Sequence, residues 1–152
     1  MDDREILTLC DRIREISLAL HGYLRHGHLE KVYENGLGHR LRKAGIGFEQ
    51  QHPLKVSDED GATLGEYYAD FLVEGCLVVE LKACKALANE HTAQLLDYLR
   101  ASRMEHGLLI NFGASRLEIR KFQISLSSAC ALSFLVNILC FLCLLWLTHL
   151  SA

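Results

Sequence analysis

The chain has 152 residues, half of them hydrophobic, and a formal net charge of -3. This length supports one domain with a hydrophobic core and is too short for two ordinary ones. The charge balance excludes a protein that binds nucleic acid through a strongly basic character of the whole chain, although a local basic patch stays possible.

The first predicted elements are two amphipathic helices. Apolar residues recur at steps of three and four from Asp3 to about Leu20, and again from about Leu29 to Ala44. Gly22 and Gly27 are expected to separate the helices. The inner face of the second helix is predicted to consist of Leu29, Val32, Leu37 and Leu41.

Strands are predicted next, with one further helix among them. The expected strands are 48–56, two within the stretch YYADFLVEGCLVVELKA (67–83), 107–112 and a last edge strand at 117–122, with a helix over 86–103. Pro53 favours an edge position for the first strand. The order α, α, β, β, β, α, β, β predicts an α/β fold in which helices flank a mixed sheet.

Three charged residues interrupt the apolar strands of the 67–83 stretch. Glu80 and Lys82 are two residues apart, so their side chains leave one face of a strand. Asp70 shares that face only if the hairpin loop has an odd number of residues. We expect the loop to be residues 73–75, ending in a glycine in the left-handed conformation, with Asp70 opposite Val78.

Two carboxylates and an ammonium on one face suit a hard divalent cation. Mg²⁺ prefers oxygen ligands and commonly takes one or two protein carboxylates, and Mn²⁺ can replace it. Lys82 would then orient or help to deprotonate an attacking water and offset charge on a phosphate. The alternative is an internal salt bridge between Lys82 and Glu80 or Asp70.

The pattern Asp70, Glu80 and Lys82 across a hairpin resembles the PD-(D/E)XK nuclease superfamily. Upstream, GHLEKVY contains Gly27, Glu30 and Tyr33 in the spacing of the GxxExxY proteins. The words YADFLV, VELKA, AQLLDYL and LLINFGA are also similar to that family, so the resemblance covers roughly residues 6–122. It implies a restriction-endonuclease-like core with a mixed sheet flanked by helices.

The resemblance also implies roles for individual residues. Asp70, Glu80, the Leu81 carbonyl and Glu30 would hold the metal, and Lys82 would be the catalytic lysine. Gln94 and Tyr98 resemble the Q-x-x-x-Y motif of RecB-type exonucleases. The implied catalytic set is Asp70, Glu80, Lys82, Glu30 and Gln94, and the implied substrate-binding residues are Tyr33 and Tyr98.

The end of the chain differs from the rest, because residues 122–152 contain no Asp, Glu, Lys or Arg. We divide the chain into a nuclease-like domain, 1–122, and a hydrophobic tail, 123–152. Residues 129–147 would span roughly 30 Å as a helix, enough to cross a bilayer. Arg120 and Lys121 would keep the domain in the cytoplasm. The alternative is that the tail does not belong to the family and arose from a shifted reading frame or an altered gene end.

The expected function is metal-dependent hydrolysis of nucleic-acid phosphodiester bonds, with DNA as the expected partner and Mg²⁺ as the expected cofactor. The alternative is a catalytically silent module on the same fold that binds nucleic acid or protein. Either protein could be anchored to a membrane through residues 129–147. The acidic N-terminal stretch has no secretory pattern, and the six cysteines form no disulfide framework, so we expect a cytoplasmic domain.

Overall fold

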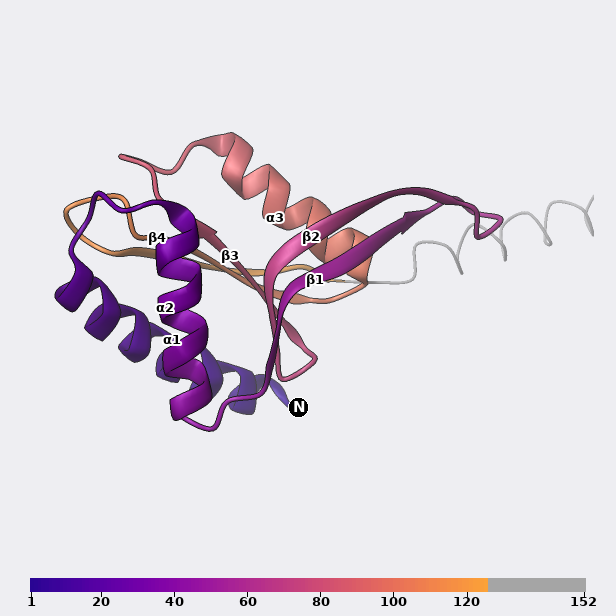
Figure 1. Cartoon of the computed structure of the whole chain (residues 1–152). Coiled ribbons are helices and arrows are strands. Elements are labelled where there is room, and N and C mark those ends of the chain that lie inside the picture. Colours follow the sequence, from indigo (N-terminus) through magenta and orange to yellow (C-terminus); the bar gives the residue numbers. More distant parts are fainter. Residues whose placement is uncertain (126–152) are drawn as a thin grey trace, which may run out of the picture.

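The computed structural model describes residues 1–125, and five strands form one mixed sheet in it. Figure 1 shows this sheet with the helices packed around it. The strands lie in chain order across the sheet, and only β3 and β4 are parallel neighbours. The predicted order of helices and strands and the mixed sheet are confirmed. The strands are β1 (Phe48–Ser57), β2 (Thr63–Val73), β3 (Leu77–Lys82), β4 (His106–Asn111) and β5 (Glu118–Gln123).

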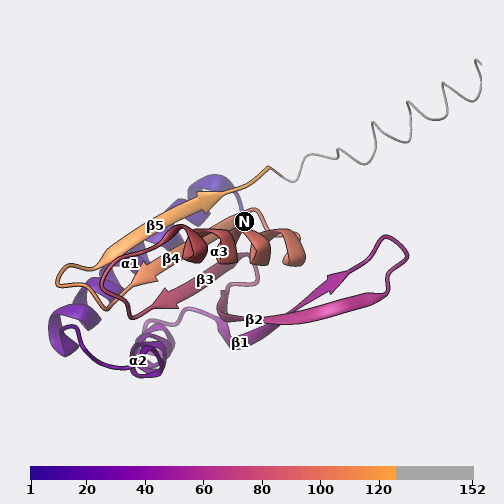
Figure 2. The same ribbon diagram turned by 90° about the horizontal axis from the view of Figure 1, so that it is seen from above.

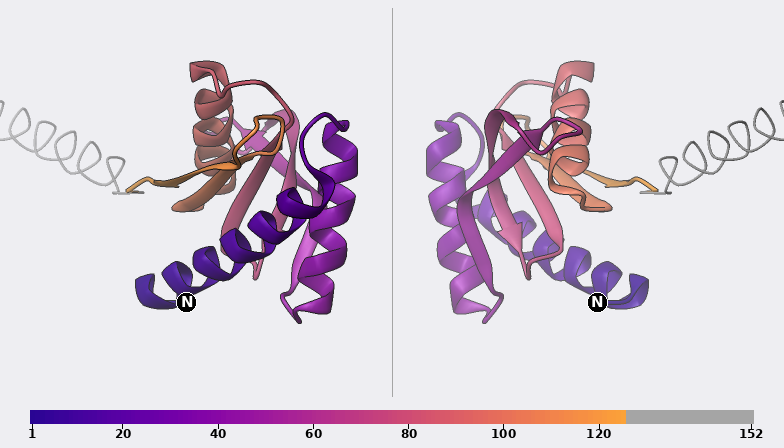
Figure 3. Two further views of the ribbon diagram at one scale, coloured as in Figure 1. Left: turned by 90° about the vertical axis from the view of Figure 1, so that its left-hand side faces the viewer. Right: turned by 90° about the vertical axis from the view of Figure 1, so that its right-hand side faces the viewer.

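Helices cover both faces of the sheet, which Figures 2 and 3 show from above and from the ends. Helices α1 (Asp3–Leu24) and α2 (Glu30–Lys43) bury Ile13 and Leu37 against Phe71 in one apolar cluster. Helix α3 (Asn89–Ser102) connects the parallel strands β3 and β4 and packs on the other face. The sheet therefore has a separate apolar core on each side.

Helix α1 is longer than the sequence predicted. Its start is fixed by a capping box, in which Asp2 and Glu5 exchange backbone to side-chain hydrogen bonds of 2.7 and 2.8 Å. Gly22 does not end the helix, which continues to Leu24. A glycine inside a helix costs about 1 kcal/mol relative to alanine, and Leu24 offsets this cost by packing against the core.

The inner face of α2 also differs from the prediction. Leu29 and Val32 are 77% and 41% exposed, whereas Tyr33, Leu37 and Leu41 are fully buried. These three residues follow each other at intervals of four, so they form one row along the helix. The Tyr33 ring stacks on Phe112 with 4.9 Å between ring centroids, and this contact fixes the rotation of the helix.

Strands β1 and β2 extend beyond the rest of the sheet as a two-stranded arm (Figures 1 and 2). The pairing of β2 with β3 ends at Phe71, whereas β2 remains paired with β1 as far as Thr63. Gln51 adopts a positive φ of 53° and is left out of the pairing at the point where the arm begins. The predicted edge position of the strand containing Pro53 is confirmed.

The candidate transmembrane helix, 129–147, lies outside the described residues. Within residues 1–125, none of the helices combines the length and the apolar character that crossing a membrane requires.

Candidate active site

The hairpin between β2 and β3 has a loop of odd length, as predicted. Val73 pairs with Leu77, which leaves the three residues 74–76 in the loop, and Gly75 has a left-handed φ of 65°. The loop lies one position later than expected. Continuing the register places Asp70 opposite Glu80 rather than Val78. The odd loop length therefore brings the two carboxylates together at the end of the β2–β3 pairing.

Asp70 is held in place by hydrogen bonds from two strands. Its Oδ2 accepts a hydrogen bond of 2.7 Å from the backbone N–H of Leu81, and its Oδ1 accepts one of 3.1 Å from Nε2 of Gln51. Burial raises the pKa of Asp70, and the nearby Glu30 raises it further. The Leu81 hydrogen bond opposes this rise, because it stabilises the ionised carboxylate.

Glu80 is the most perturbed group of the site. Its side chain is only 4% exposed, and its Oε1 accepts a hydrogen bond of 2.7 Å from Nζ of Lys82. Its Oε2 is buried and has no hydrogen-bond partner within residues 1–125. Burial and the Asp70 carboxylate raise the pKa of Glu80 to about 7. An acceptor that is both buried and unpaired is costly, and such cases concentrate at functional sites.

Lys82 remains charged at neutral pH in this environment. Burial lowers the pKa of its ammonium, but the ion pair with Glu80 and the charge of Glu30 outweigh burial and raise it overall. A charged ammonium donates hydrogen bonds and attracts anions, but it does not accept a proton. This favours orientation and charge compensation over the role of a base.

Helix α2 brings two further acidic residues to the site. Oε2 of Glu30 accepts a hydrogen bond of 3.2 Å from the backbone N–H of Ala83, directly after β3. Glu34 is buried, and its Oε1 accepts hydrogen bonds from Lys31, Gln50 and Gln51. Burial alone would raise the pKa of Glu34, but these donors lower it overall.

Gln51 was not predicted as a site residue, yet it joins the two acidic groups. Its Nε2 donates to Asp70 Oδ1 and also to Glu34 Oε1, at 3.1 and 3.0 Å. Gln51 is also the residue of β1 that has a positive φ of 53°. A strained backbone conformation of this kind often marks a functional position.

The two predicted substrate-binding tyrosines have different surroundings. Tyr33 is completely buried, and its hydroxyl donates to the carbonyl of Arg25 at 2.7 Å. It therefore has no exposed surface for a substrate, and its role in this structure is packing. Tyr98 is 7% exposed, and Nε2 of Gln94 donates to its hydroxyl at 2.8 Å. Burial raises the pKa of Tyr98, and the charge of Glu80 raises it further.

Asn111, a second residue missed from the sequence, supports the backbone that follows Lys82. It is fully buried at the end of β4, beside Lys82 in the parallel register. Its Oδ1 accepts hydrogen bonds from the backbone N–H groups of Cys84 and Gly113, at 3.1 and 3.0 Å. The signal was present, because Asn111 is the one polar residue in the apolar word LLINF.

Side chains alone do not complete a metal site here: in residues 1–125, no group of three His, Cys, Asp or Glu residues is arranged to hold an ion. Asp70 and Glu80 nevertheless fit a hard divalent cation, which commonly combines one or two carboxylates with water. The buried, unpaired Oε2 of Glu80 supplies a free oxygen ligand. The mutual repulsion of the carboxylates, which contributes to the raised pKa of Glu80, would be relieved by a positive charge between them.

A mixed sheet with two carboxylates and a lysine at the end of a central hairpin defines a nuclease-like domain. The family model of the PD-(D/E)XK nuclease superfamily matches residues 8–122, and the chain belongs to this superfamily. Nucleases of the superfamily generally use divalent metals and act on nucleic acids. The fold and the nuclease-like character expected from the sequence are therefore supported.

Comparison with solved structures supports the fold alone. The crystal structure of SSO0001 superposes with a TM-score of 0.51 at 18% sequence identity. The similarity covers 73% of this chain and 57% of that protein, so the chain corresponds to little more than half of its length. Among curated proteins, none gives a significant match.

Proposed function

We propose that this protein is a metal-dependent nuclease that hydrolyses phosphodiester bonds in nucleic acid, with DNA as the substrate and Mg²⁺ as the cofactor. Mn²⁺ is the expected substitute. Membership of the superfamily supports the class of reaction. The observation that carries the proposal is Glu80, a buried carboxylate with a pKa of about 7 and one oxygen without a partner, beside Asp70.

The proposed metal ligands are Asp70, Glu80 and the carbonyl of Leu81, with Glu30 close by. When bound, the ion would supply positive charge that polarises the phosphate and makes water a better nucleophile. The chain itself holds the ligands in position. The Leu81 N–H and Gln51 orient Asp70, and the Ala83 N–H orients Glu30.

Lys82 and Gln94 are proposed to act on the substrate. The Lys82 ammonium lies 2.7 Å from Glu80 Oε1, where it can orient water and offset charge that develops on the phosphate. Gln94 is half-buried and donates from Nε2 to the Tyr98 hydroxyl, while its amide oxygen takes part in none of the hydrogen bonds within residues 1–125 and is proposed to orient substrate or water. Tyr98 is proposed to contact the substrate strand.

A nuclease assay tests this proposal most directly. The purified full-length chain is incubated with single-stranded and duplex DNA and RNA in Mg²⁺, Mn²⁺ or EDTA. Asp70→Asn and Lys82→Met should each lower the cleavage rate by about 100-fold or more, because each removes charge from the reacting centre. Glu15→Gln, at an exposed position of α1, is the matched control and should cleave like the wild type. Cleavage that is equal in all four proteins would come from a contaminant and would overturn the proposal.

A binding module without turnover is the second candidate. One observation favours it: Lys82 and Glu80 form a buried ion pair, which is the arrangement of a purely structural salt bridge. Binding of nucleic acid by the wild type without Mg²⁺-dependent or Mn²⁺-dependent cleavage would identify this second function.

Within the superfamily, we propose that the chain belongs to the GxxExxY proteins. The support is the motif of Gly27, Glu30 and Tyr33, in which the structure gives each residue a distinct place. Gly27 has a positive φ of 108°, Glu30 bonds to the backbone after β3, and Tyr33 packs in the core. The motif therefore couples the loop before α2 to the candidate active site.

A further inference from the structure

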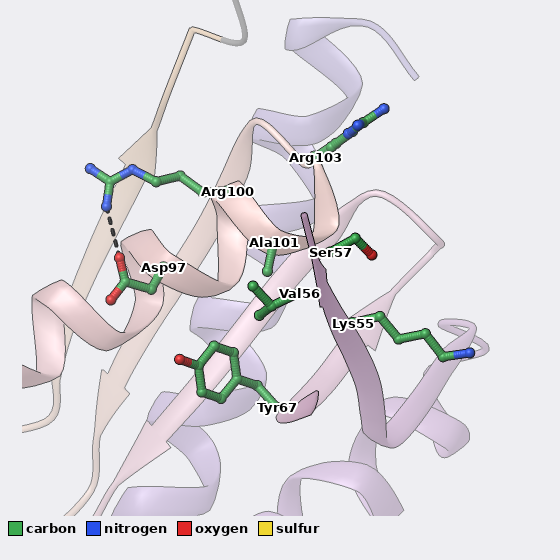
Figure 4. Close-up of a pocket in the computed structure, with 8 residues that line it drawn as sticks. All are labelled: Lys55, Val56, Ser57, Tyr67, Asp97, Arg100, Ala101 and Arg103. Atoms are coloured by element: carbon green, nitrogen blue, oxygen red, sulfur yellow. Dashed lines mark hydrogen bonds and ion pairs between the residues drawn. The ribbon is translucent and has the colours of Figure 1, made fainter. Parts of the chain in front are cut away.

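A cavity of about 500 Å³ lies between the β1–β2 arm and the end of α3, outside the acidic centre (Figure 4). Three of its lining residues are basic: Lys55 from the arm, Arg100 from α3 and Arg103 directly after α3. Asp97 is the acidic residue of the lining, and it forms an ion pair of 2.8 Å with Arg100. Lys55 and Arg103 form no ion pair within residues 1–125.

Two of the three basic side chains of this cavity are outside the ion pairs found within residues 1–125. Figure 4 shows the side chains of Lys55 and Arg103 on one side of the cavity, away from the Asp97–Arg100 pair. Glu66 lies opposite Lys55 on the neighbouring strand and accepts a hydrogen bond of 2.6 Å from the Tyr68 hydroxyl, so its negative charge partly offsets that of Lys55. Lys55 and Arg103 are engaged in no ion pair within residues 1–125, so each can contact a phosphate directly although the net charge of the protein is -3.

Tyr67 connects this basic cavity with the candidate active site. It is 45% exposed and lines both this cavity and a second cavity that contains Gln94 and Tyr98. Its ring lies 5.5 Å from the ring of Tyr98, in a tilted arrangement. Tyr67 is also three residues from Asp70 on β2, which corresponds to about 10 Å along a strand.

We propose that the cavity binds single-stranded nucleic acid on its way to the candidate active site. Lys55 and Arg103 contact backbone phosphates, and Tyr67 stacks on a base. Basic side chains combined with an exposed aromatic ring are typical of single-strand recognition, because unpaired bases offer free faces for stacking. The bases of a duplex already stack on each other. The inference rests on the proposed nuclease function and specifies its substrate.

The test measures binding without cleavage. A fluorescently labelled oligothymidylate of about 20 nucleotides is titrated with the full-length chain in EDTA at several salt concentrations, and a duplex of equal length is titrated in parallel. The wild type should bind the single strand more tightly. Salt dependence is measured as the slope of the logarithm of the binding constant against the logarithm of the salt concentration. In the Lys55→Ala, Arg103→Ala double variant, the magnitude of this slope should be smaller by about 1.4, because each phosphate contact on a single strand contributes about 0.7.

Tyr67→Ala provides a second and different readout. It should weaken binding by about 5- to 150-fold, since a stacked base contributes about 1–3 kcal/mol, and it should leave the salt dependence unchanged. Tyr67→Phe keeps the ring and should restore binding. The matched controls are Arg14→Ala and Tyr23→Ala, which change exposed residues of α1 and should bind like the wild type.

The outcomes separate this inference from the proposed function. A chain that binds the single strand as described but cleaves nothing would overturn the nuclease function and support the binding site. A chain that cleaves DNA, but whose Lys55→Ala, Arg103→Ala double variant and Tyr67→Ala variant both bind like the wild type, would overturn the binding site alone. Tighter binding of the duplex than of the single strand would also overturn it.

Discussion

Glu80 links the chemistry of the candidate site to the stability of the protein. The pKa of a free glutamate is about 4.5, whereas that of Glu80 is about 7. Between pH 4.5 and pH 7, Glu80 is therefore protonated in the folded protein and ionised in the unfolded chain. The free energy of unfolding of the metal-free protein therefore falls as the pH rises from about 4.5 to above 7. The shift of the Glu80 pKa corresponds to about 3 kcal/mol of unfolding free energy. This stabilisation is lost progressively between pH 4.5 and pH 7 and is absent above pH 7.

Glu80→Gln should remove this pH dependence, because glutamine does not titrate. We expect the unfolding free energy of the wild type in EDTA to fall between pH 5 and pH 8 by about 2.5 kcal/mol more than that of the variant. Urea denaturation at both pH values measures the difference. The raised pKa of Lys82 adds a contribution that is constant over this range, since its ammonium stays charged.

Magnesium ions provide the control for this prediction. At pH 8, Mg²⁺ should raise the urea midpoint of the wild type, because the ion relieves the repulsion between Glu80 and Asp70, and it should have little effect on Glu80→Gln. If the unfolding free energies of the two proteins in EDTA change with pH in the same way, the pKa of Glu80 is not raised as described.

The sequence predicted the charged side chains of the site better than their supports. Asp70, Glu80 and Lys82 were visible as charges inside apolar strands, and the parity of the loop was enough to bring them together. Gln51 and Asn111 were missed, because their roles depend on which residues lie beside the hairpin in the folded sheet. Strand pairing over long separations is not encoded in local spacing.

At the scale of elements, the segments that follow β3 and β4 contact each other closely at Gly113, and a substitution there can test this contact. A Cβ atom at Gly113 would lie 2.3 Å from both the backbone carbon of Ala83 and the backbone nitrogen of Cys84. Gly113→Ala would therefore push apart the segments after β3 and β4, next to Lys82. We expect it to lower the free energy of unfolding by at least about 3 kcal/mol, since the clash involves backbone atoms.

Gly22→Ala is the matched control, with an expected effect of opposite sign. Among residues 1–125, and leaving aside the backbone of α1 itself, no atom lies within 4 Å of a Cβ atom at Gly22, which is inside α1. Alanine should therefore stabilise the helix by about 0.5 to 1 kcal/mol. Urea denaturation of both variants measures the two effects. Equal stability of Gly113→Ala and the wild type would mean that the two segments are not held as closely as described.

The errors in the predicted elements have one physical origin. Helix periodicity gave the existence and order of the helices, but the rotation of α2 was decided by the contact of Tyr33 with Phe112, which lies far away in sequence. Similarly, the low helix propensity of glycine predicts that α1 ends near Gly22, but the packing of Leu24 against the core extends the helix past it. Local preference is weak compared with tertiary contacts at such positions.

At the scale of the whole molecule, the uncharged run 129–147 raises a question separate from the site. We expect it to anchor the protein in a membrane with the nuclease-like domain in the cytoplasm. The full-length chain should then sediment with membranes, resist extraction by high salt and dissolve in detergent. A chain that ends at residue 125 should stay in the supernatant.

A substitution within the run tests the anchor more sharply. Ile138→Arg places a charge near its middle, at a cost of about 2.5 to 3.5 kcal/mol for insertion, and should release much of the protein from membranes. Ile138→Leu is the control and should behave like the wild type. A full-length chain that stays in the supernatant would count against the anchor and leave the proposed site unaffected.

The two turns of the β1–β2–β3 meander constrain chain length in opposite ways. Removing one residue from the 74–76 loop would reverse the faces of one strand relative to the other, so either Phe71 or Val79 would leave the core and Asp70 and Glu80 would no longer share a face. In this chain, the odd length of the loop is therefore a condition for Asp70 and Glu80 to share a face. The tip of the arm, residues 58–62, is exposed and far from the core, so it is free to gain or lose single residues.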